Sequence, residues 1–499
     1  MTKLKLLFPL NINKPEDLMK IKLAVLTVFS LFIVMLSHVN SVAAPGDLDP
    51  TFGGSGTIGI SANTIPTRVR IQSDGKIVTF GYYPYGKYSY ISRNNADGTP
   101  DYTFGSGGVV TIHYYPSLEF LVDYVELHDG KYLVVGTKNS AFALFRYNSN
   151  GTRDASFGSN GVWTPLGSDG PSEGNAIIIQ SDGKVIVSGF SDTGFLIRFN
   201  QNGSPDESFG INGKVISAFG NLGELTIQPD GKILAWVEGQ SPKIVRYNPN
   251  GSPDGSFGAG GVLTPAIDYR GDMALSPDGK LVISGRLINL RSVIARYNAN
   301  GILDASFGIN GEVSLTETPE NSYSSGKARA LVVQRNGKIV FAGDRDAVFS
   351  ISRLNYDGTA DETFGTNGTV ITPLAPICRF YDVTIQADGR IVAVGDAGSS
   401  SSAQYVGLIR YIGDPPPVTL SGKVTTPNGR GLRNAVVRLT DPLGVVRTVN
   451  TSSFGLYHFD DVTPAESYTI TVSSKRYRFA AANVLVKGNM VNFDLVGME

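Results

Sequence analysis

The side chains that most often carry out chemistry are scarce in this 499-residue chain. It contains four histidines, His38, His113, His128 and His458, and a single cysteine, Cys378. No histidine or glycine lies at the spacing of a GxSxG, HExxH or P-loop motif. One cysteine can form neither an intramolecular disulfide nor a zinc site built from several cysteines. The composition therefore predicts a protein without catalytic residues, a bound cofactor or a metal ion.

One segment superficially resembles a calcium-binding loop. In residues 248–254, Asn, Ser and Asp side chains surround Gly251. Placing Gly251 at the sixth position of an EF-hand loop puts Arg246 first and Phe257 twelfth, where carboxylate ligands belong. A cation at the first ligand position argues against calcium. We interpret the segment as a turn whose Asn and Asp side chains bond to nearby backbone.

This segment belongs to a longer pattern, Asp-x-x-Phe-Gly-x-x-Gly, that recurs seven times. Its aspartates are Asp49, Asp101, Asp154, Asp206, Asp254, Asp304 and Asp361, and its phenylalanines, 48 to 57 residues apart, are Phe52, Phe104, Phe157, Phe209, Phe257, Phe307 and Phe364. A second marker is an Asp-Gly-Lys turn, or a close variant of it, between two apolar runs. Its first residue is Asp74, Asp129, Asp182, Asp230, Asp278, Asn336 or Asp388. A third marker is an arginine at Arg93, Arg146, Arg198, Arg246, Arg296, Arg353 and Arg410. A period near 50 residues is typical of propellers, and we expect one Arg–Asp pair in each repeat.

The sequence of each repeat predicts four short strands. In the third repeat they are expected at 176–180, 184–189, 195–200 and 214–217, with an Asp-Gly hairpin after the first. Such sheets are apolar on both faces and are stabilised by stacking around an axis. We predict an all-β, seven-bladed β-propeller over residues 44–412, closed by pairing of the terminal strands 57–60 and 408–411. Cys378 is expected in a variable loop before the last blade.

The recurring motifs carry a family resemblance. Ile-Gln-x-Asp-Gly-Lys-Ile, Arg-Tyr-Asn-x-Asn-Gly and Asp-x-Ser-Phe-Gly, over about 46–412, resemble the delta-60 repeat family of secreted bacterial β-propellers. The resemblance implies a fold and an exported location. It implies no catalytic residues.

A second domain is expected after a proline-rich linker at 413–417. Short strands predicted at 418–425, 435–441, 445–451, 456–462, 468–474 and 490–496 indicate a small β-sandwich over 418–499. The sequences at 455–459 and 468–472 resemble the carboxypeptidase regulatory-like, transthyretin-like fold, although Ser452 and Arg476 depart from its pattern. Such domains are accessory modules, so the resemblance implies no peptidase activity.

Function on a ring of similar repeats is expected where the repeats differ. The uniform hairpins and Asn-Gly turns share one face of the predicted ring, and the variable loops share the other. Two neighbouring variable loops are rich in aromatic residues, namely Tyr82, Tyr83, Tyr85, Tyr88, His113, Tyr114 and Tyr115. Such rings suit stacking on sugars or anchoring a protein partner, and they equally suit covering loop backbone. We predict a non-enzymatic scaffold or binding protein for a protein or glycan ligand.

An enzymatic alternative stays open. Propellers also host glycan hydrolases and lyases, which would use acidic residues near the central opening. Hydrolysis needs two carboxyls roughly 5 to 9.5 Å apart. The acidic residues that do not belong to the repeat markers include Glu119, Glu126, Glu173 and Glu224. Sequence alone does not pair them.

Charge and the amino-terminal segment bear on location and partners. The chain has 43 basic and 44 acidic residues, which gives no electrostatic reason to expect nucleic acid as a partner. Residues 1–43 have the pattern of a secretory signal peptide, with Lys20 and Lys22 before an apolar run at 23–36 and Ala43 at the cut. Met19 is an alternative start. We expect a secreted, extracellular, cell-surface or periplasmic monomer without a transmembrane anchor in the mature chain.

Overall fold

The computed structural model describes residues 44–498 except for 63, 84–87, 114–118, 166–172, 240–241, 268, 288–290, 316–326, 346–347, 375–376, 399–403, 415–417, 443, 465–466 and 487–488. The expected signal peptide at 1–43 lies outside the described residues. Tyr85, Tyr114 and Tyr115 also lie outside them.

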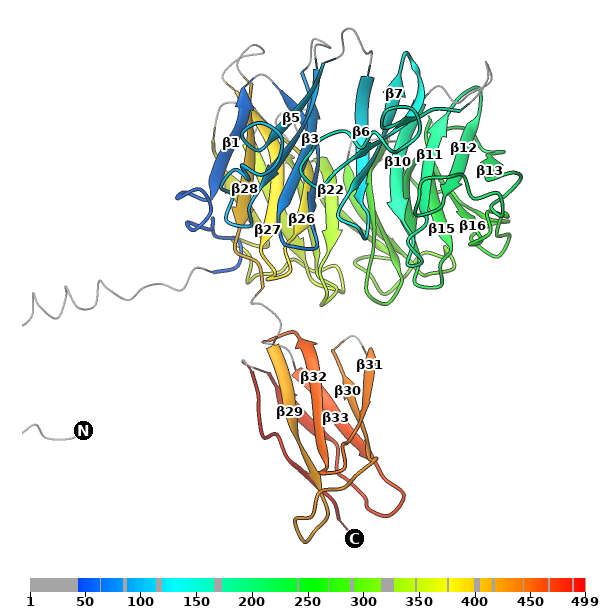
Figure 1. Ribbon diagram of the computed structural model, residues 1–499. Coiled ribbons are helices and arrows are strands. Elements are labelled where there is room, and N and C mark those ends of the chain that lie inside the picture. Colours follow the sequence, from blue (N-terminus) through cyan, green and yellow to red (C-terminus); the bar gives the residue numbers. More distant parts are fainter. Residues whose placement is uncertain are drawn as a thin grey trace, which may run out of the picture. The chain divides into compact units, whose positions relative to one another are not determined.

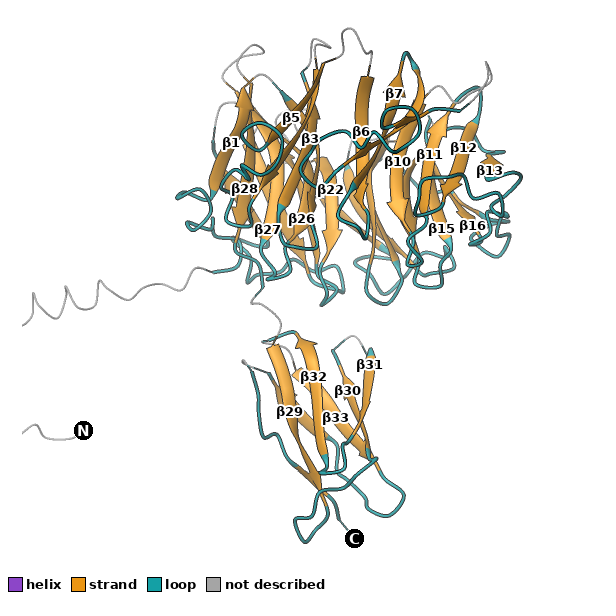
Figure 2. Ribbon diagram, viewed as in Figure 1, coloured by secondary structure: helices purple, strands orange, loops and turns teal. Residues whose placement is uncertain are grey.

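The regular elements of the described residues are all strands (Figures 1 and 2). Strands β1 to β28 form seven four-stranded antiparallel sheets, which we call blades 1 to 7. Blade 1 contains β2 (Ile65–Ile71), β3 (Ile77–Tyr82), β4 (Tyr88–Asn94) and β5 (Val109–His113). Blade 2 contains β6 (Glu119–Glu126), β7 (Tyr132–Lys138), β8 (Ala141–Tyr147) and β9 (Val162–Trp163). Blade 3 contains β10 (Glu173–Ile179), β11 (Val185–Phe190), β12 (Gly194–Phe199) and β13 (Lys214–Ile216).

The next blades repeat the same order. Blade 4 contains β14 (Leu222–Ile227), β15 (Ile233–Val237), β16 (Lys243–Tyr247) and β17 (Val262–Leu263). Blade 5 contains β18 (Tyr269–Leu275), β19 (Leu281–Arg286), β20 (Ser292–Tyr297) and β21 (Glu312–Leu315). Blade 6 contains β22 (Lys327–Val333), β23 (Ile339–Arg345), β24 (Val348–Leu354) and β25 (Thr369–Thr372).

Blade 7 is built from both ends of the repeat region. It contains β26 (Ile377–Ile385), β27 (Ile391–Gly398), β28 (Gln404–Tyr411) and β1 (Thr57–Ala62). Strand β1 pairs antiparallel with β28, with Thr57 opposite Ile409. This pairing agrees with the expected closure, and it covers an edge of β28 that would otherwise offer unpaired backbone groups.

Neighbouring blades share hydrophobic cores. Val78, Phe80 and Ile91 of blade 1 pack in one buried cluster with Val134 and other residues of blade 2. The rings of Phe80 and Tyr124 stack with their centroids 4.6 Å apart across this junction. Each blade therefore buries both faces only when its two neighbours are present, which confirms the all-β propeller prediction.

The C-terminal domain has two sheets around its own core. Its strands are β29 (Val418–Thr425), β30 (Val436–Thr440), β31 (Val446–Asn450), β32 (Leu456–Val462), β33 (Ser467–Ser473), β34 (Ala482–Leu485) and β35 (Leu495–Val496). The sheets have the orders β32-β29-β35 and β31-β30-β33-β34. Val437, Phe459 and Ile470 are buried in the shared core. The predicted small β-sandwich is therefore confirmed.

Two details of the sequence reading of this domain are wrong. Strand β34 was not expected, because its four residues are too few to show a clear alternation. The strand expected at 490–496 is regular only at Leu495–Val496. Before that point, a side-chain oxygen of Asp494 accepts the bond from Lys423 N at 2.8 Å, so a carboxylate replaces the backbone acceptor of a regular ladder.

Cys378 also differs from expectation. It lies in β26, opposite Ala397 of β27, and not in a loop. The first strand of blade 7 spans nine residues and therefore includes a segment that the repeat comparison assigned to the preceding loop. Among the described residues, no helix is long and apolar enough to cross a membrane.

Candidate functional site

The repeated arginines and aspartates form one ion pair in every blade. The Arg Nε to Asp Oδ2 distance is 2.6–2.8 Å in all seven blades. Each guanidinium also lies over the phenylalanine ring of its repeat, 4.5–4.7 Å from the ring centroid. The expected pair in each repeat is confirmed, and its identity in seven blades marks it as part of the fold.

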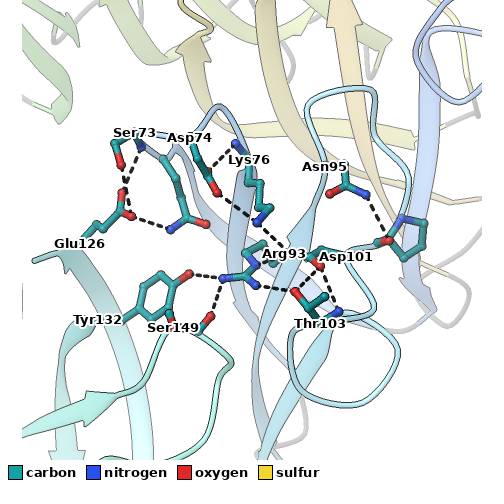
Figure 3. A network of polar contacts seen from close by, with 12 residues as sticks. Ser73, Asp74, Lys76, Arg93, Asn95, Asp101, Thr103, Glu126, Tyr132 and Ser149 are labelled. Carbon is teal, nitrogen blue, oxygen red and sulfur yellow. Dashed lines mark hydrogen bonds and ion pairs between the residues drawn. The ribbon is translucent and has the colours of Figure 1, made fainter. Parts of the chain in front are cut away.

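Figure 3 shows this network in blade 1. Arg93 Nε donates to Asp101 at 2.7 Å, and Arg93 Nη1 donates to the hydroxyl oxygen of Tyr132 in blade 2 at 2.7 Å. The Thr103 hydroxyl donates to Asp101 at 2.6 Å, and Lys76 Nζ lies 3.4 Å from the same carboxylate. Burial alone would raise the pKa of Asp101, but the bonds from Thr103 and the charges of Arg93 and Lys76 lower it to about 2. Asp101 thus stays ionised, and it holds Arg93, which in turn contacts blade 2.

The network changes where the chain leaves the propeller. In blades 1 to 5 and 7, Nη1 of the arginine donates to a backbone carbonyl of the next blade. In blade 6, Arg353 Nη1 donates instead to the side chain of Asp414 at 2.8 Å. Asn336 Nδ2 donates to the other oxygen of Asp414 at 2.9 Å. A carboxylate therefore replaces the carbonyl that a further repeat would have supplied, and it ties residue 414 to blade 6.

The segment at 248–254 is a turn held by its own side chains. Asn248 Nδ2 donates to Ser252 Oγ at 2.9 Å, and Ser252 N donates to Asn250 Oδ1 at 3.0 Å. Arg246 is buried and pairs with Asp254. These bonds confirm the interpretation of the segment as a turn.

The structure places four of the predicted aromatic site residues in two sets of ring contacts, one on each face of blade 1, because Tyr82 and Tyr83 are consecutive and point to opposite faces. The rings of Tyr83 and Tyr88 stack with centroids 5.3 Å apart, and Tyr88 meets His113 edge to face at 6.1 Å. Tyr82 lies beside Phe120 of the next blade, with centroids 5.6 Å apart. We call Tyr82, Tyr83, Tyr88, His113 and Phe120 the aromatic cluster. His113 is exposed and the other four side chains are half-buried, so ring surface stays accessible. The Tyr82–Phe120 contact spans blades 1 and 2, whereas the contacts of Tyr83, Tyr88 and His113 lie within blade 1.

Sequence reasoning missed Phe120. It lies in the first strand of blade 2 and not in a loop, so a search of variable loops passed over it. Its position directly after Glu119, at the start of a strand that adjoins the aromatic loop, was the available signal. Tyr85, Tyr114 and Tyr115 lie outside the described residues and are not placed.

Two of the four acidic candidates, Glu126 and Glu224, line one cavity, and the other two, Glu119 and Glu173, do not. Glu119 is buried and lies 2.7 Å from Arg153 and 3.4 Å from Lys138. Glu126 accepts bonds from Gln72 Nε2 at 3.0 Å and Ser73 N at 3.1 Å, as Figure 3 shows for its contact with Ser73. Glu173 is exposed at the start of β10. Glu224 lies in β14 and, like Glu126, lines a cavity among the first strands of the blades.

This cavity is a second candidate site. The sequence singled out two of its residues, Glu126 and Glu224, as acidic candidates, but not Arg68, Arg70 or Asp123. Its volume is about 330 Å³, and β2, β6, β10 and β14 of blades 1 to 4 line it. Its charged residues are Arg68, Arg70, Asp123, Glu126 and Glu224. These residues belong to none of the repeat markers. Asp123 has an aspartate at the matching position in two other blades, Asp272 and Asp382, and the other four each occur once at their positions.

Two family models match the chain. A model described as a domain of unknown function (DUF5122) β-propeller matches residues 72–104, 128–157, 180–209, 228–257, 276–307 and 334–364. A model of the carboxypeptidase regulatory-like domain matches residues 419–496. No curated protein shows significant sequence similarity to the chain.

Several solved structures are similar to the chain at low identity. YCF48 bound to D1 peptide is 12% identical, with 76% of this chain and 100% of that chain covered and a TM-score of 0.45. The Dos1 propeller is 9% identical, with 75% and 96% covered and a TM-score of 0.43. A gluconolactonase from Xanthomonas campestris is 13% identical, with 74% and 97% covered and a TM-score of 0.34.

Proposed function

We propose that this chain is an exported, non-enzymatic binding protein. The premise is that it belongs to the DUF5122 β-propeller family and carries a C-terminal carboxypeptidase regulatory-like domain. The aromatic cluster of blades 1 and 2 recognises its ligand, which is a glycan or a protein surface. The observation that carries the proposal is the run of ring contacts that joins Tyr83, Tyr88 and His113.

Physical chemistry supports binding at this cluster. A tyrosine ring offers a flat apolar face and a hydroxyl, and it loses little conformational freedom when it binds. Rings that already support one another lose still less. A glycan ligand would stack its sugar rings on Tyr83, Tyr88 and His113, whereas a protein ligand would place an apolar side chain against them. Both modes leave the repeated networks of the blades untouched.

The matched experiment uses tyrosines on two parts of blade 1. The variant carries Tyr82→Ala, Tyr83→Ala and Tyr88→Ala, and the control carries Tyr102→Ala, a tyrosine that is 77% exposed in a repeated turn. Both proteins are applied to an array of glycans and surface proteins. We expect the triple variant to bind at least about thirtyfold more weakly, which corresponds to a hot spot of about 2 kcal/mol, and the control to bind like the parent.

Two outcomes would contradict the proposal. Unchanged capture by a triple variant that keeps the far-UV circular dichroism of the parent would show that the cluster is not the site. Release of reducing ends from an array glycan, abolished by Glu224→Gln, would replace binding by the enzymatic alternative. Glu224 is chosen for this test because it lines the cavity among the first strands of the blades.

Export is the remaining part of the proposal. Lys20 and Lys22 precede the apolar run at 23–36, and small residues follow it. Sequencing the amino terminus of the protein recovered from an expressing cell tests this directly. We expect the recovered chain to begin at Ala44. An intact leader on protein confined to the cytoplasm would refute export.

A further inference from the structure

The cavity among the first strands of blades 1 to 4 has the properties of a small-molecule site. Its volume of about 330 Å³ lies at the lower end of the range for ligand pockets. Aliphatic side chains, including Ile71, Val125 and Leu225, share its lining with side chains of both charges. Charged groups set among apolar walls can orient a bound molecule.

The charge at one ring of positions varies between blades. Six residues before the hairpin Asp or Asn of each blade, the chain has in turn Arg68, Asp123, Ala176, Glu224, Asp272, Ala330 and Asp382. The ion pair on the third strand, by contrast, is identical in all seven blades. Where the residue is aspartate it can join blades, because Asp272 accepts a bond from Leu331 N of blade 6 at 2.8 Å and Asp382 accepts one from Val69 N of blade 1 at 2.9 Å. Arg68 and Glu224 each occur once at this position, so these two residues are the ones that point to a ligand.

A bulge places this ring of residues. In every blade, the pairing of the first and second strands shifts register just before or at this position. The shift interrupts the strict alternation of faces, so that Asp123 and Tyr124 are both buried although they are consecutive. On blade 3 the residue is Ala176, and its small side chain leaves space between Asp123 of blade 2 and Glu224 of blade 4.

The two arginines of blade 1 differ in their partners. Arg70 Nη1 donates to Asp382 at 2.7 Å, and Asp382 also accepts a bond from Val69 N at 2.9 Å. Arg68 Nη1 contacts only the carbonyl of Thr67, at 3.4 Å, among the hydrogen bonds found for its guanidinium in the described residues. Burial lowers the pKa of Arg68, but the charges of Asp123, Asp382 and Glu224 outweigh burial and raise it. Arg68 is thus a cation that the carboxylates of the cavity attract.

We propose that this cavity binds a small aliphatic zwitterion, an amino acid or a dipeptide, with its carboxylate at Arg68 and its ammonium group at Glu224 and Asp123. Arg68 and Glu224 belong to blades 1 and 4, which are as far apart as a seven-membered ring allows. The ligand therefore lies across the opening with its aliphatic side chain against Val125 and Leu225.

Other ligand classes fit this lining less well. An anion would meet Arg68 but would also face the carboxylates of Asp123 and Glu224, and a cation would meet the carboxylates but face Arg68. A neutral sugar would satisfy both kinds of group, yet it gains most from aromatic walls, and the walls here are mainly aliphatic. A zwitterion places opposite charges against both groups and loses neither contact.

Calorimetric titration of the protein tests the proposal. The probes are leucine, leucyl-leucine, the N-acetylated and C-amidated forms of leucyl-leucine, and glucose. We expect leucine or leucyl-leucine to bind and each blocked form to bind at least tenfold more weakly, because each loses one charged hydrogen bond. Arg68→Met should weaken the C-amidated form little further, since that form no longer has the carboxylate that Arg68 recognises.

The substitutions replace each side chain by one of similar size, so that the wall of the cavity stays filled. Arg68→Met and Glu224→Gln each weaken binding of the zwitterion at least tenfold, whereas Arg291→Met, at an exposed arginine bonded to Ser314, leaves it unchanged. Far-UV circular dichroism and the melting temperature confirm that each variant is folded. Absence of binding of both zwitterions, binding that both cavity variants retain, or stronger binding of glucose would each overturn the proposal. The tyrosine variants of the aromatic cluster should bind the zwitterion like the parent, so the two proposals fail independently.

Discussion

Replacing Asp49 by alanine tests how the ring is closed. Asp49 precedes β1, and its carboxylate lies 2.8 Å from Arg410 Nε and 2.7 Å from Arg390 Nε. The aspartate is 1% exposed and Arg410 is 3% exposed. In the other six blades the paired residues are eight positions apart, whereas Asp49 and Arg410 come from opposite ends of the repeat region. Asp49→Ala thus removes the Arg–Asp ion pair that every blade contains, and it does so in blade 7, where the two ends of the repeat region meet.

The expected magnitude follows from burial. Removing one partner of a buried ion pair costs about 3–5 kcal/mol, because the other charge stays buried without compensation. The unfolding entropy is about 2.1 cal/mol/K per residue, so roughly 350 propeller residues give about 0.7 kcal/mol/K. Asp49→Ala should therefore lower Tm by about 4–7 °C. Asp74 is exposed and Lys76 is half-buried, so loss of this pair in the control Asp74→Ala should lower Tm by less than about 2 °C.

Hydrogen exchange distinguishes loss of closure from a general loss of stability. In Asp49→Ala, the amides that pair β1 with β28, around Thr57 and Ile409, should exchange faster than those of blade 3. In Asp206→Ala, which removes the same pair inside blade 3, the order should be reversed. A Tm of Asp49→Ala equal to that of Asp74→Ala, or uniform acceleration of exchange in all blades, would refute the reasoning.

Three further predictions concern the blades and their networks. Gly98 has φ +91°, and a Cβ there would lie 2.6 Å from Phe52, so Gly98→Ala should cost at least about 2 kcal/mol in urea unfolding. Because the folded pKa of Asp101 is about 2, below its unfolded value, the stability it contributes is present above about pH 4 and is lost as pH falls towards 2. A urea midpoint that did not fall from pH 5 to pH 2.5 would contradict this. Tyr356→Phe removes the bond to Lys280 Nζ (2.9 Å) and should cost about 1 kcal/mol, measured in the same way.

The blade architecture was predictable from the sequence because its determinants repeat. An arginine and an aspartate eight residues apart, with a phenylalanine three residues later, occur together in six consecutive units and, split between the chain ends, in a seventh. Identical spacing requires identical local geometry, so one interpretation applied to all copies. The complementary ends of the pattern then indicated that β1 completes blade 7.

The candidate sites were less predictable because they depend on differences between copies. The aromatic residues of blade 1 were visible as a composition change in two loops, but Phe120 came from a strand and was missed. Of the cavity, only Glu126 and Glu224 stood out, as acidic residues outside the repeat markers. Its ring position follows a bulge, where the alternation that assigns a residue to one face shifts by one, so Arg68 and Asp123 look like ordinary strand residues until the blades are placed around the axis.

The pairing of β1 with β28 also sets an order in time. Strand β1 is among the first parts of the propeller to be synthesised, and β28 is the last. At about 5–20 residues per second, roughly 350 residues take about 20–70 s, and closing so long a loop in an unfolded chain costs about 5 kcal/mol. The first six blades must therefore stack before β1 finds its partner. During that interval the ring has an open seam, with an unpaired edge on β28, and this seam is the point at which a newly made chain is most exposed to pairing with another copy.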